Sequence, residues 1–196
     1  MGALPKVLHS ELVRKYLEGL SEHTTTGLRN RVALELMYRA GLRVSEVCNL
    51  TPFHVDYLNS RFIYVQQGKN KHDRYVPIDK RLHDWCEQWD LKKEEKEIES
   101  EYFLCTMKGG QLDQRYIRAV CERLSKKTGI YIKKGRKQKP VNPHLLRHCY
   151  ATELLDEDFN IREVQQLLGH KDISTTMIYT HVRPQSLARK IGQRKV

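Results

Sequence analysis

Apolar residues recur at helical spacing through most of the chain. In residues 25–40, Leu28, Val32, Leu36 and Met37 fall on one face of a helix, because a side chain returns to the same face after three or four residues. Similar spacing predicts a helical turn over residues 45–50 and further helices over residues 10–20, 80–89, 113–128, 143–156 and 160–168. The charged stretch 91–101 is expected to be a loop or the end of a helix.

Capping residues stand where several of these helices should begin. Asn142 followed by Pro143 is typical of a helix start, since asparagine accepts hydrogen bonds from free N–H groups and proline has no N–H to leave unpaired. Asn160 is expected to cap the next helix, and Ser10 the first one.

Two segments have the composition of strands. Residues 61–66 and 74–78 are rich in β-branched and aromatic side chains, and residues 67–73 between them are typical of a hairpin loop. Residues 133–140 are basic and contain glycine and proline, so they are expected to form a loop. The pattern predicts a mainly α fold of the α+β class, a compact helical domain with a small antiparallel sheet.

Length and composition are those of one globular domain. The 196 residues are 39% hydrophobic and 30% charged, and no apolar run approaches the ~20 residues that cross a bilayer. No signal-peptide pattern opens the chain. The five cysteines, Cys48, Cys86, Cys105, Cys121 and Cys149, are widely spaced, which favours reduced thiols and a cytoplasmic location.

The charge balance favours a polyanionic partner. Lysine and arginine number 35 against 24 acidic residues, which gives a net charge of +11. Contacts between cations and phosphates release condensed counterions, so a surplus of this size indicates nucleic acid. A solvated, highly charged surface is the alternative interpretation.

His144 and Arg147 share a face of the helix predicted over residues 143–156. The planar fork of an arginine can hold two phosphate oxygens, and a histidine can move a proton near neutral pH. His148 would add a second imidazole one turn after His144, as in some metal sites. No third ligand is evident and Arg147 would repel a cation, so we expect no metal here.

Three further segments carry candidate functional residues. Arg43 follows the helix-ending Gly41, where its guanidinium could reach a phosphate together with free N–H groups. Lys69 lies in the predicted hairpin loop. Gly169 resembles a helix C-terminal glycine, and the turn after it would return the hydroxyl of Tyr179 towards His170.

Taken in order, these segments resemble the catalytic domain of tyrosine recombinases of the phage integrase family, most closely in the Xer style. The resemblance rests on residues 40–47 (AGLRVSEV), Gly68-Lys69 before residues 74–77 (RYVP), residues 143–152 (PHLLRHCYAT), residues 167–170 (LLGH) and residues 174–182 (STTMIYTHV). It extends over residues 4–182. It implies the fold of the catalytic domain of DNA breaking–rejoining enzymes.

The resemblance assigns roles to the matching positions. Tyr179 would attack the scissile phosphate and form a 3′-phosphotyrosyl link. Arg43 and Arg147 would hold the non-bridging oxygens, and His170 would add a hydrogen bond to them. Two arginines and a histidine could neutralise the phosphate without a metal, and the covalent link would conserve the energy of the ester without ATP. No cofactor is therefore expected.

Proton transfer falls to the remaining positions. Lys69 would protonate the leaving 5′ oxygen, with Lys71 as a rival for this role, and His144 would assist proton transfer at the tyrosine. The basic residues expected to contact DNA are Lys71, Arg74, Lys134, Arg136 and Lys137.

The resemblance also implies a domain organisation and partners. We expect residues 1–182 to form the catalytic domain, residues 183–196 a basic tail, and the family's N-terminal core-binding domain to be absent from this chain. The tail would either dock on a neighbouring protomer or bind phosphate. The expected partner is a double-stranded recombination site at the nucleoid, bound by a homo-tetramer whose protomers are monomeric or weakly associated without DNA, with no membrane involved.

Two alternatives to a site-specific recombinase or integrase stay open. A type IB-like topoisomerase would use similar residues to relax supercoils. A non-catalytic DNA-binding regulator would keep the fold without the reaction, although each of the six catalytic positions carries a competent residue type.

Overall fold

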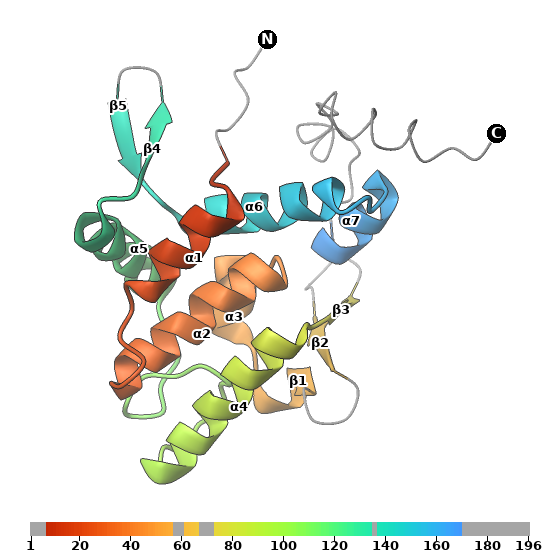
Figure 1. Ribbon diagram of the computed structural model, residues 1–196. Coiled ribbons are helices and arrows are strands. Elements are labelled where there is room, and N and C mark those ends of the chain that lie inside the picture. The colour runs from red at the N-terminus through yellow and green to blue at the C-terminus, as the bar shows by residue number, and fades with distance from the viewer. Residues whose placement is uncertain (1–6, 57–60, 67–72, 135–136, 170–196) are drawn as a thin grey trace, which may run out of the picture.

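Seven α-helices, a short 3-10 helix and five strands make up the described part of the chain (Figure 1). The computed structural model describes residues 7–56, 61–66, 73–134 and 137–169. The elements follow in the order α1 (Ser10–Glu18), α2 (Thr25–Arg39), α3 (Val44–Asn49), η1 (Pro52–His54), β1 (Val55–Asp56), β2 (Phe62–Val65), β3 (Arg74–Pro77), α4 (Lys80–Glu95), α5 (Gln114–Thr128), β4 (Tyr131–Lys134), β5 (Lys137–Pro140), α6 (Pro143–Asp156) and α7 (Ile161–Leu168). This is the mainly helical fold with a small antiparallel sheet that the sequence predicts.

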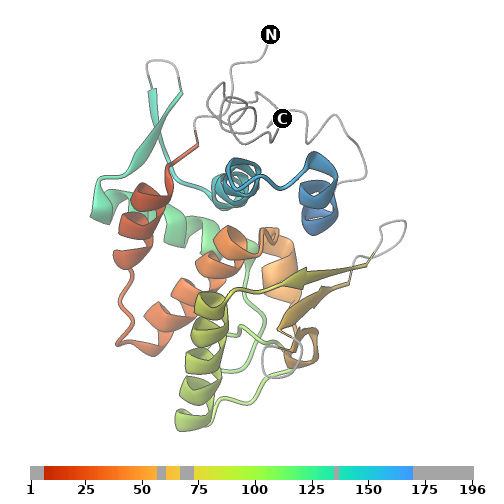
Figure 2. The ribbon, with the colours of Figure 1, turned by 45° about the vertical axis from the view of Figure 1, so that its right-hand side comes forward.

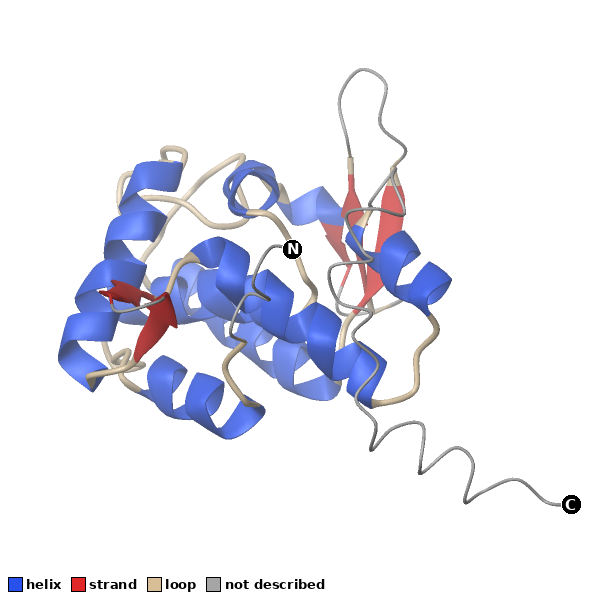
Figure 3. Cartoon of the chain, turned by 90° about the horizontal axis from the view of Figure 1, so that it is seen from above, coloured by secondary structure: helices blue, strands red, loops and turns tan. Residues whose placement is uncertain are grey.

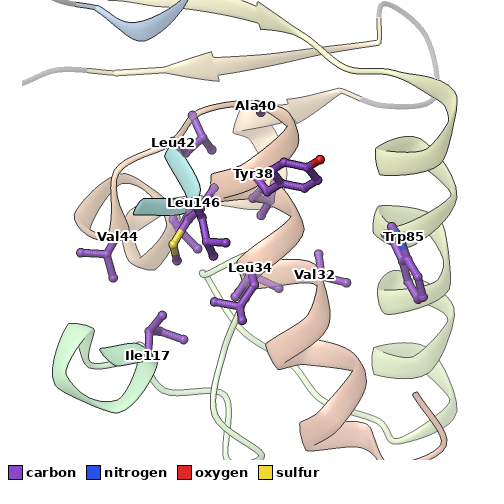
Figure 4. Close-up of a cluster of buried hydrophobic side chains, with 14 of the residues drawn as sticks. Val32, Leu34, Tyr38, Ala40, Leu42, Val44, Trp85, Ile117 and Leu146 are labelled. Atoms are coloured by element: carbon purple, nitrogen blue, oxygen red, sulfur yellow. The ribbon is translucent and has the colours of Figure 1, made fainter. Parts of the chain in front are cut away.

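Helix α2 lies at the centre of the core. Its apolar positions were expected on one face, but the helix is buried on almost every side because α4 and α6 both pack against it. Figure 4 shows Val32 directed towards Trp85 of α4, while Leu34 lies towards Leu146 of α6 and Ile117 of α5. A helix enclosed in this way gives the rest of the domain a rigid support.

The strands form two separate sheets on opposite sides of the helical body (Figure 3). Strands β1, β2 and β3 pair antiparallel in that order, with Ile63 opposite Val76 and Tyr64 opposite Tyr75. Figure 2 shows α7 above β3, and the two elements are in contact. The larger sheet therefore holds β3 against the last described helix.

The loop predicted over residues 133–140 is wrong: β4 and β5 pair there as an antiparallel hairpin. Ile132 packs against the core, while Lys137 and Lys139 are exposed. Only two residues connect the strands, a length typical of tight hairpins. Charged side chains do not prevent pairing when one side of a ribbon faces water.

Several helix ends agree with the predicted caps. The side chains of Asn142 and Asn160 accept hydrogen bonds from the first turns of α6 and α7. Ser10 was expected to cap the first helix, but it is the first helical residue and His9 is the N-cap. Helix α4 continues past the predicted end at residue 89 to Glu95. Ion pairs between Lys93 and Asp90 and between Lys92 and Glu95 support this extra turn.

All five cysteines are buried and free. In the described part of the chain, no helix combines the length and the apolar character needed to span a bilayer.

Candidate functional site

Three arginines from three different elements surround one carboxylate. Arg43 precedes α3, Arg74 lies on β3 and Arg147 lies on α6, and each has a guanidinium nitrogen near the carboxylate of Glu46 in α3. The distances to Glu46 are 2.6 Å from Arg43 Nη1, 2.9 Å from Arg74 Nη2 and 3.7 Å from Arg147 Nη1. These four residues are called the arginine cluster below.

The chain reversal after α2 places Arg43. Gly41 takes a left-handed conformation with φ of +61°, which ends the helix and turns the chain towards α3. The backbone N–H of Arg43 then donates to Glu46 Oε2 over 2.7 Å, and its Nη1 donates to Glu46 Oε1. The Arg43 side chain is 27% exposed, so part of its guanidinium is open to a ligand.

Arg147 is held by backbone carbonyls. Its Nη1 donates to the oxygen of Gly41, and its Nη2 donates to the oxygen of Leu168 over 2.5 Å. The side chain is only 6% exposed. Arg43 and Arg147, which the family resemblance assigns to the same phosphate, therefore lie together, with Gly41 and Glu46 joining them.

The C-terminal end of α7 meets all three arginines. Successive carbonyl oxygens of Leu167, Leu168 and Gly169 accept hydrogen bonds from Arg74, Arg147 and Arg43, in that order. The carbonyl end of a helix carries partial negative charge, so it is attracted to these cations. Gly169 is the C-cap of α7, as expected, and adopts a left-handed conformation with φ of +65°.

Arg74, which was expected to contact DNA, is buried in the protein. Its side chain is 5% exposed, and Nε, Nη1 and Nη2 donate to Leu167 and Glu46 within the protein. Strand alternation explains this position, because Arg74 shares the buried face with Val76 while Tyr75 points outward. In this structure each nitrogen of the Arg74 guanidinium is therefore paired within the protein.

The electrostatics of the cluster favour an anion. Burial opposes ionisation of Glu46, but the hydrogen bond and the charge of Arg74, followed by those of Arg43, lower the pKa of Glu46 to about 2. Three guanidinium groups against one carboxylate leave a net charge of 3 − 1 = +2. A tetrahedral phosphate with two free oxygens matches both the sign of this charge and the fork geometry of arginine.

His144 stands beside the cluster near the start of α6. It is exposed, and its pKa is lowered by partial burial and by the positive charges of Arg147, Arg118 and Arg43. The pKa of His148 is lowered too, by burial first and then by His144 and Arg147. His144 is therefore a neutral imidazole at neutral pH, able to accept a proton.

The other predicted residues are only partly described. Lys137 is exposed on β5, while Lys134 belongs to β4 without a described side chain. Five predicted residues lie outside the described residues, and these are Lys69, Lys71, Arg136, His170 and Tyr179. The covalent chain makes His170 the next residue after Gly169, which Arg43 contacts.

Sequence reasoning missed Glu46 and Arg118. Glu46 lies three residues after Arg43, a spacing that allows both a capping box and an ion pair, so a signal was present. Arg118 is an exposed residue of α5, and nothing in the sequence places it near His144 because the two are brought together only by helix packing.

One group of described side chains could hold a metal ion, and it belongs to α4. His83, Asp84 and Glu87 have ligand atoms within 4.8 Å of one another. None of them belongs to the arginine cluster, and Nδ1 of His83 is 3.1 Å from Asp84 Oδ1.

Comparison with known proteins places these features in a family context. The chain matches the model of the phage integrase family over residues 6–186. It is 35% identical over 185 residues to tyrosine recombinase XerD of Listeria innocua, and 39% identical over 190 residues to tyrosine recombinase XerA of Thermococcus kodakarensis. These alignments cover 92% and 95% of this chain, but only 59% and 62% of the relatives. The chain thus spans about three fifths of their length.

Solved structures show the same fold. The crystal structure of XerA recombinase matches with a TM-score of 0.80 and 27% identity, over 100% of this chain and 68% of that one. The XerH recombinase, solved on a palindromic difH substrate after cleavage, matches with a TM-score of 0.77 and 24% identity, over 97% of this chain and 54% of that one. The second match shows likeness of fold alone.

Proposed function

The chain belongs to the phage integrase family, and we propose that it is a site-specific DNA recombinase that cleaves and rejoins DNA through a 3′-phosphotyrosyl bond. The single observation that carries this proposal is the convergence of Arg43 and Arg147 on one positively charged site beside His144. XerD and XerA are named tyrosine recombinases, and XerH was solved on its difH substrate, which supports DNA as the substrate here.

The chemistry is a transfer of a phosphoryl group from one oxygen to another. The phenolic oxygen of Tyr179 attacks phosphorus, the bond from phosphorus to the 5′ oxygen breaks, and a 3′-phosphotyrosyl bond forms. Lys69 gives a proton to the leaving 5′ oxygen, and His144 takes the proton of the phenol. Attack by a 5′ hydroxyl reverses these steps and reseals the strand, so neither ATP nor a metal enters the balance.

The arginines lower the energy of the transition state. Negative charge builds up on the non-bridging oxygens as the tyrosine attacks, and preorganised cations stabilise this charge more than they stabilise the ground state. Arg43 is open enough to contact an oxygen directly. His170 adds a donor from the residue that follows Gly169.

The assembly proposed for the reaction is a homo-tetramer on a double-stranded recombination site, with weak or no association of the protomers away from DNA. Four active sites are needed because two duplexes exchange both strands. Such a substrate would place the enzyme at the nucleoid, in the cytoplasm.

A nicked suicide substrate tests the proposal. Cleavage near a nick releases a short strand, so the covalent protein–DNA complex cannot be resealed and accumulates. A pool of nicked duplexes with randomised arms is incubated with wild type, with Tyr179→Phe and with the control Tyr75→Phe, whose ring is exposed on β3. Wild type and the control should give a denaturation-resistant complex, and Tyr179→Phe should give none.

The outcomes separate the three candidate functions. A complex with Tyr179→Phe would mean that another side chain is the nucleophile. DNA binding with no complex for any variant would favour the regulator. The DNA recovered from the covalent complex gives the sequence that the enzyme cleaves, called the trapped sequence below. Relaxation of supercoiled DNA, with no exchange of strands between two duplexes that carry the trapped sequence, would favour the topoisomerase.

A further inference from the structure

Within the proposed function, we infer that Arg74 is a positioning residue, which sets the arginine cluster from inside the protein without touching DNA. It fixes the carboxylate of Glu46 and the end of α7, and through them it orients Arg43 and Arg147 towards the scissile phosphate. The inference rests on the proposed function, but its geometry belongs to described residues.

The first support is that all three guanidinium nitrogens of Arg74 donate hydrogen bonds within the protein. Nη1 and Nη2 donate to the two oxygens of Glu46 over 3.0 and 2.9 Å, which is a bidentate fork. Nε donates to the carbonyl oxygen of Leu167 over 2.8 Å. A bidentate pair fixes the plane of the carboxylate as well as its distance.

The second support is the position of Glu46 between the arginines. Glu46 Oε1 accepts from Arg74 and from Arg43 Nη1, and Oε2 accepts from Arg74 and from the backbone N–H of Arg43. The plane that Arg74 gives to Glu46 therefore also sets the direction of the Arg43 guanidinium. Without the fork, the carboxylate could rotate and carry Arg43 away from a phosphate.

The third support is the end of α7. Arg74 holds the carbonyl of Leu167, while Arg147 and Arg43 hold those of Leu168 and Gly169. Arg74 is as deeply buried as Arg147 and far more buried than Arg43, since it comes from the inner face of β3. It therefore anchors the helix turn on which the two phosphate-binding arginines also rest.

A direct contact between Arg74 and DNA makes the opposite prediction for binding. A phosphate contact contributes to affinity and to the salt dependence of affinity. A positioning residue contributes to the rate of cleavage, because a displacement of about 1 Å at the reacting groups can cost ~100-fold in rate. The two roles separate in the dissociation constant and the single-turnover rate.

The test compares Arg74→Lys with Arg81→Lys, a matched change at an exposed arginine of α4. Both variants keep the net charge, but lysine cannot form the fork. Binding is measured on a duplex of the sequence trapped by wild type, and cleavage on its nicked form. We expect Arg74→Lys to cleave ~100-fold more slowly than wild type. Its dissociation constant for DNA, and the dependence of that constant on salt, should equal those of Arg81→Lys.

A pH profile separates positioning from loss of folded protein. In Arg74→Met, Glu46 loses the largest contribution that keeps its pKa low, while burial still favours the neutral acid. The cleavage rate per folded molecule should then begin to fall at a higher pH in Arg74→Met than in wild type, whose own acid limb reports on His144. A mere loss of folded protein would leave the rate per folded molecule, and its dependence on pH, as in wild type.

Three results would overturn the inference. A wild-type cleavage rate in Arg74→Lys would show that the fork does not orient the site. Weaker DNA binding with a reduced salt slope would make Arg74 a DNA contact. The third result is amide hydrogen exchange over residues 164–169 that is no faster in Arg74→Lys than in wild type and in Arg81→Lys, because Arg74 would then not hold the end of α7.

This exchange measurement does not depend on catalysis. If wild type forms no covalent complex, the proposed function fails, but the exchange still reports on Arg74.

Discussion

Arg43 donates a hydrogen bond from Nη2 to the carbonyl oxygen of Gly169 over 3.2 Å. This contact joins the segment before α3 to the end of α7, although the residues are 126 positions apart in the chain. A predicted phosphate-binding arginine is thereby tied to the residue that precedes His170.

Replacement of Arg43 by lysine should remove most of the cleavage activity and little of the stability. Lysine keeps the charge but cannot bind Glu46, Gly169 and a phosphate at once, because it lacks the planar fork. Loss of one donor to the transition state typically costs ~100- to 1,000-fold in rate. Single-turnover cleavage of the trapped sequence measures this effect, and Arg81→Lys is the control. A rate within tenfold of wild type would remove Arg43 from the transition-state contacts.

Glu46→Gln should be less stable than wild type at neutral pH. The pKa of Glu46 is about 2 in the folded chain against the ordinary value of 4.5, a difference of 4.5 − 2 = 2.5. At ~1.4 kcal/mol for each pKa unit, the ionised form contributes about 3 kcal/mol to the free energy of unfolding.

The sign of the pH dependence follows from the lowered pKa. The contribution of Glu46 is complete above pH 4.5 and is lost as pH falls towards 2, so wild type should lose stability over this range and Glu46→Gln should lose less. Urea denaturation across this pH range, with the exposed Glu122→Gln as control, measures the difference. Parallel curves for wild type and Glu46→Gln would contradict the assignment.

The acid limb of the cleavage rate should report on His144. Its pKa lies below the ordinary value because of burial and the charges of Arg147, Arg118 and Arg43, so the neutral proton acceptor persists to lower pH. Removal of one charge in Arg118→Gln should raise that pKa and move the limb to higher pH. Lys126→Gln on the same helix is the matched control, since Lys126 is not among the charges that lower the pKa of His144. If the acid limb lies at the same pH in Arg118→Gln as in wild type, a group other than His144 is responsible for it.

The sequence was most informative where structure is local. Helix spacing and the asparagine caps depend on residues within one or two turns, so α2, α6 and α7 were predicted close to their observed bounds. The meeting of Arg43 with Arg147 came from resemblance to a family, because no local pattern relates positions so far apart in the chain.

The sequence was less informative about contacts between elements. Arg74 was expected to reach DNA because it is a cation next to a basic loop, yet Val76 two positions later already indicated that both face inward. Burial of that face depends on α7 and Glu46, which no strand pattern contains. The β4–β5 hairpin was missed for a similar reason, since its pairing partners are all polar or exposed except near its base.

Gly41→Ala should destabilise the domain and disturb the phosphate site together. A Cβ at this position would lie 2.5 Å from the Tyr150 ring and 2.8 Å from Leu168, and φ of +61° is strained for alanine. The control is Gly129→Ala, which has similar backbone strain at φ of +69° but no atom within 4 Å of the added carbon. Overpacking adds ~1–3 kcal/mol to the strain at Gly41.

The effect on the site follows because the carbonyl of Gly41 accepts from Arg147. Urea denaturation should show a larger loss for Gly41→Ala than for Gly129→Ala, and only Gly41→Ala should cleave more slowly when fully folded. Equal losses of unfolding free energy in the two variants would mean that backbone strain alone explains the requirement for glycine at position 41.

Lys137→Gln should weaken DNA binding without changing sequence preference. Lys137 and Lys139 are both exposed on β5, and because they are two residues apart in a strand they lie on the same face. One phosphate contact contributes ~0.9 to the slope of log affinity against log salt concentration. We therefore expect the slope to flatten by about that amount, with the dissociation constant raised equally on trapped and random duplexes. The control is Lys108→Gln, an exposed lysine in the turn before Gly109. Both variants lose one positive charge, so an effect of net charge alone would change the salt slope equally in both. A phosphate contact at Lys137 requires a larger change in Lys137→Gln.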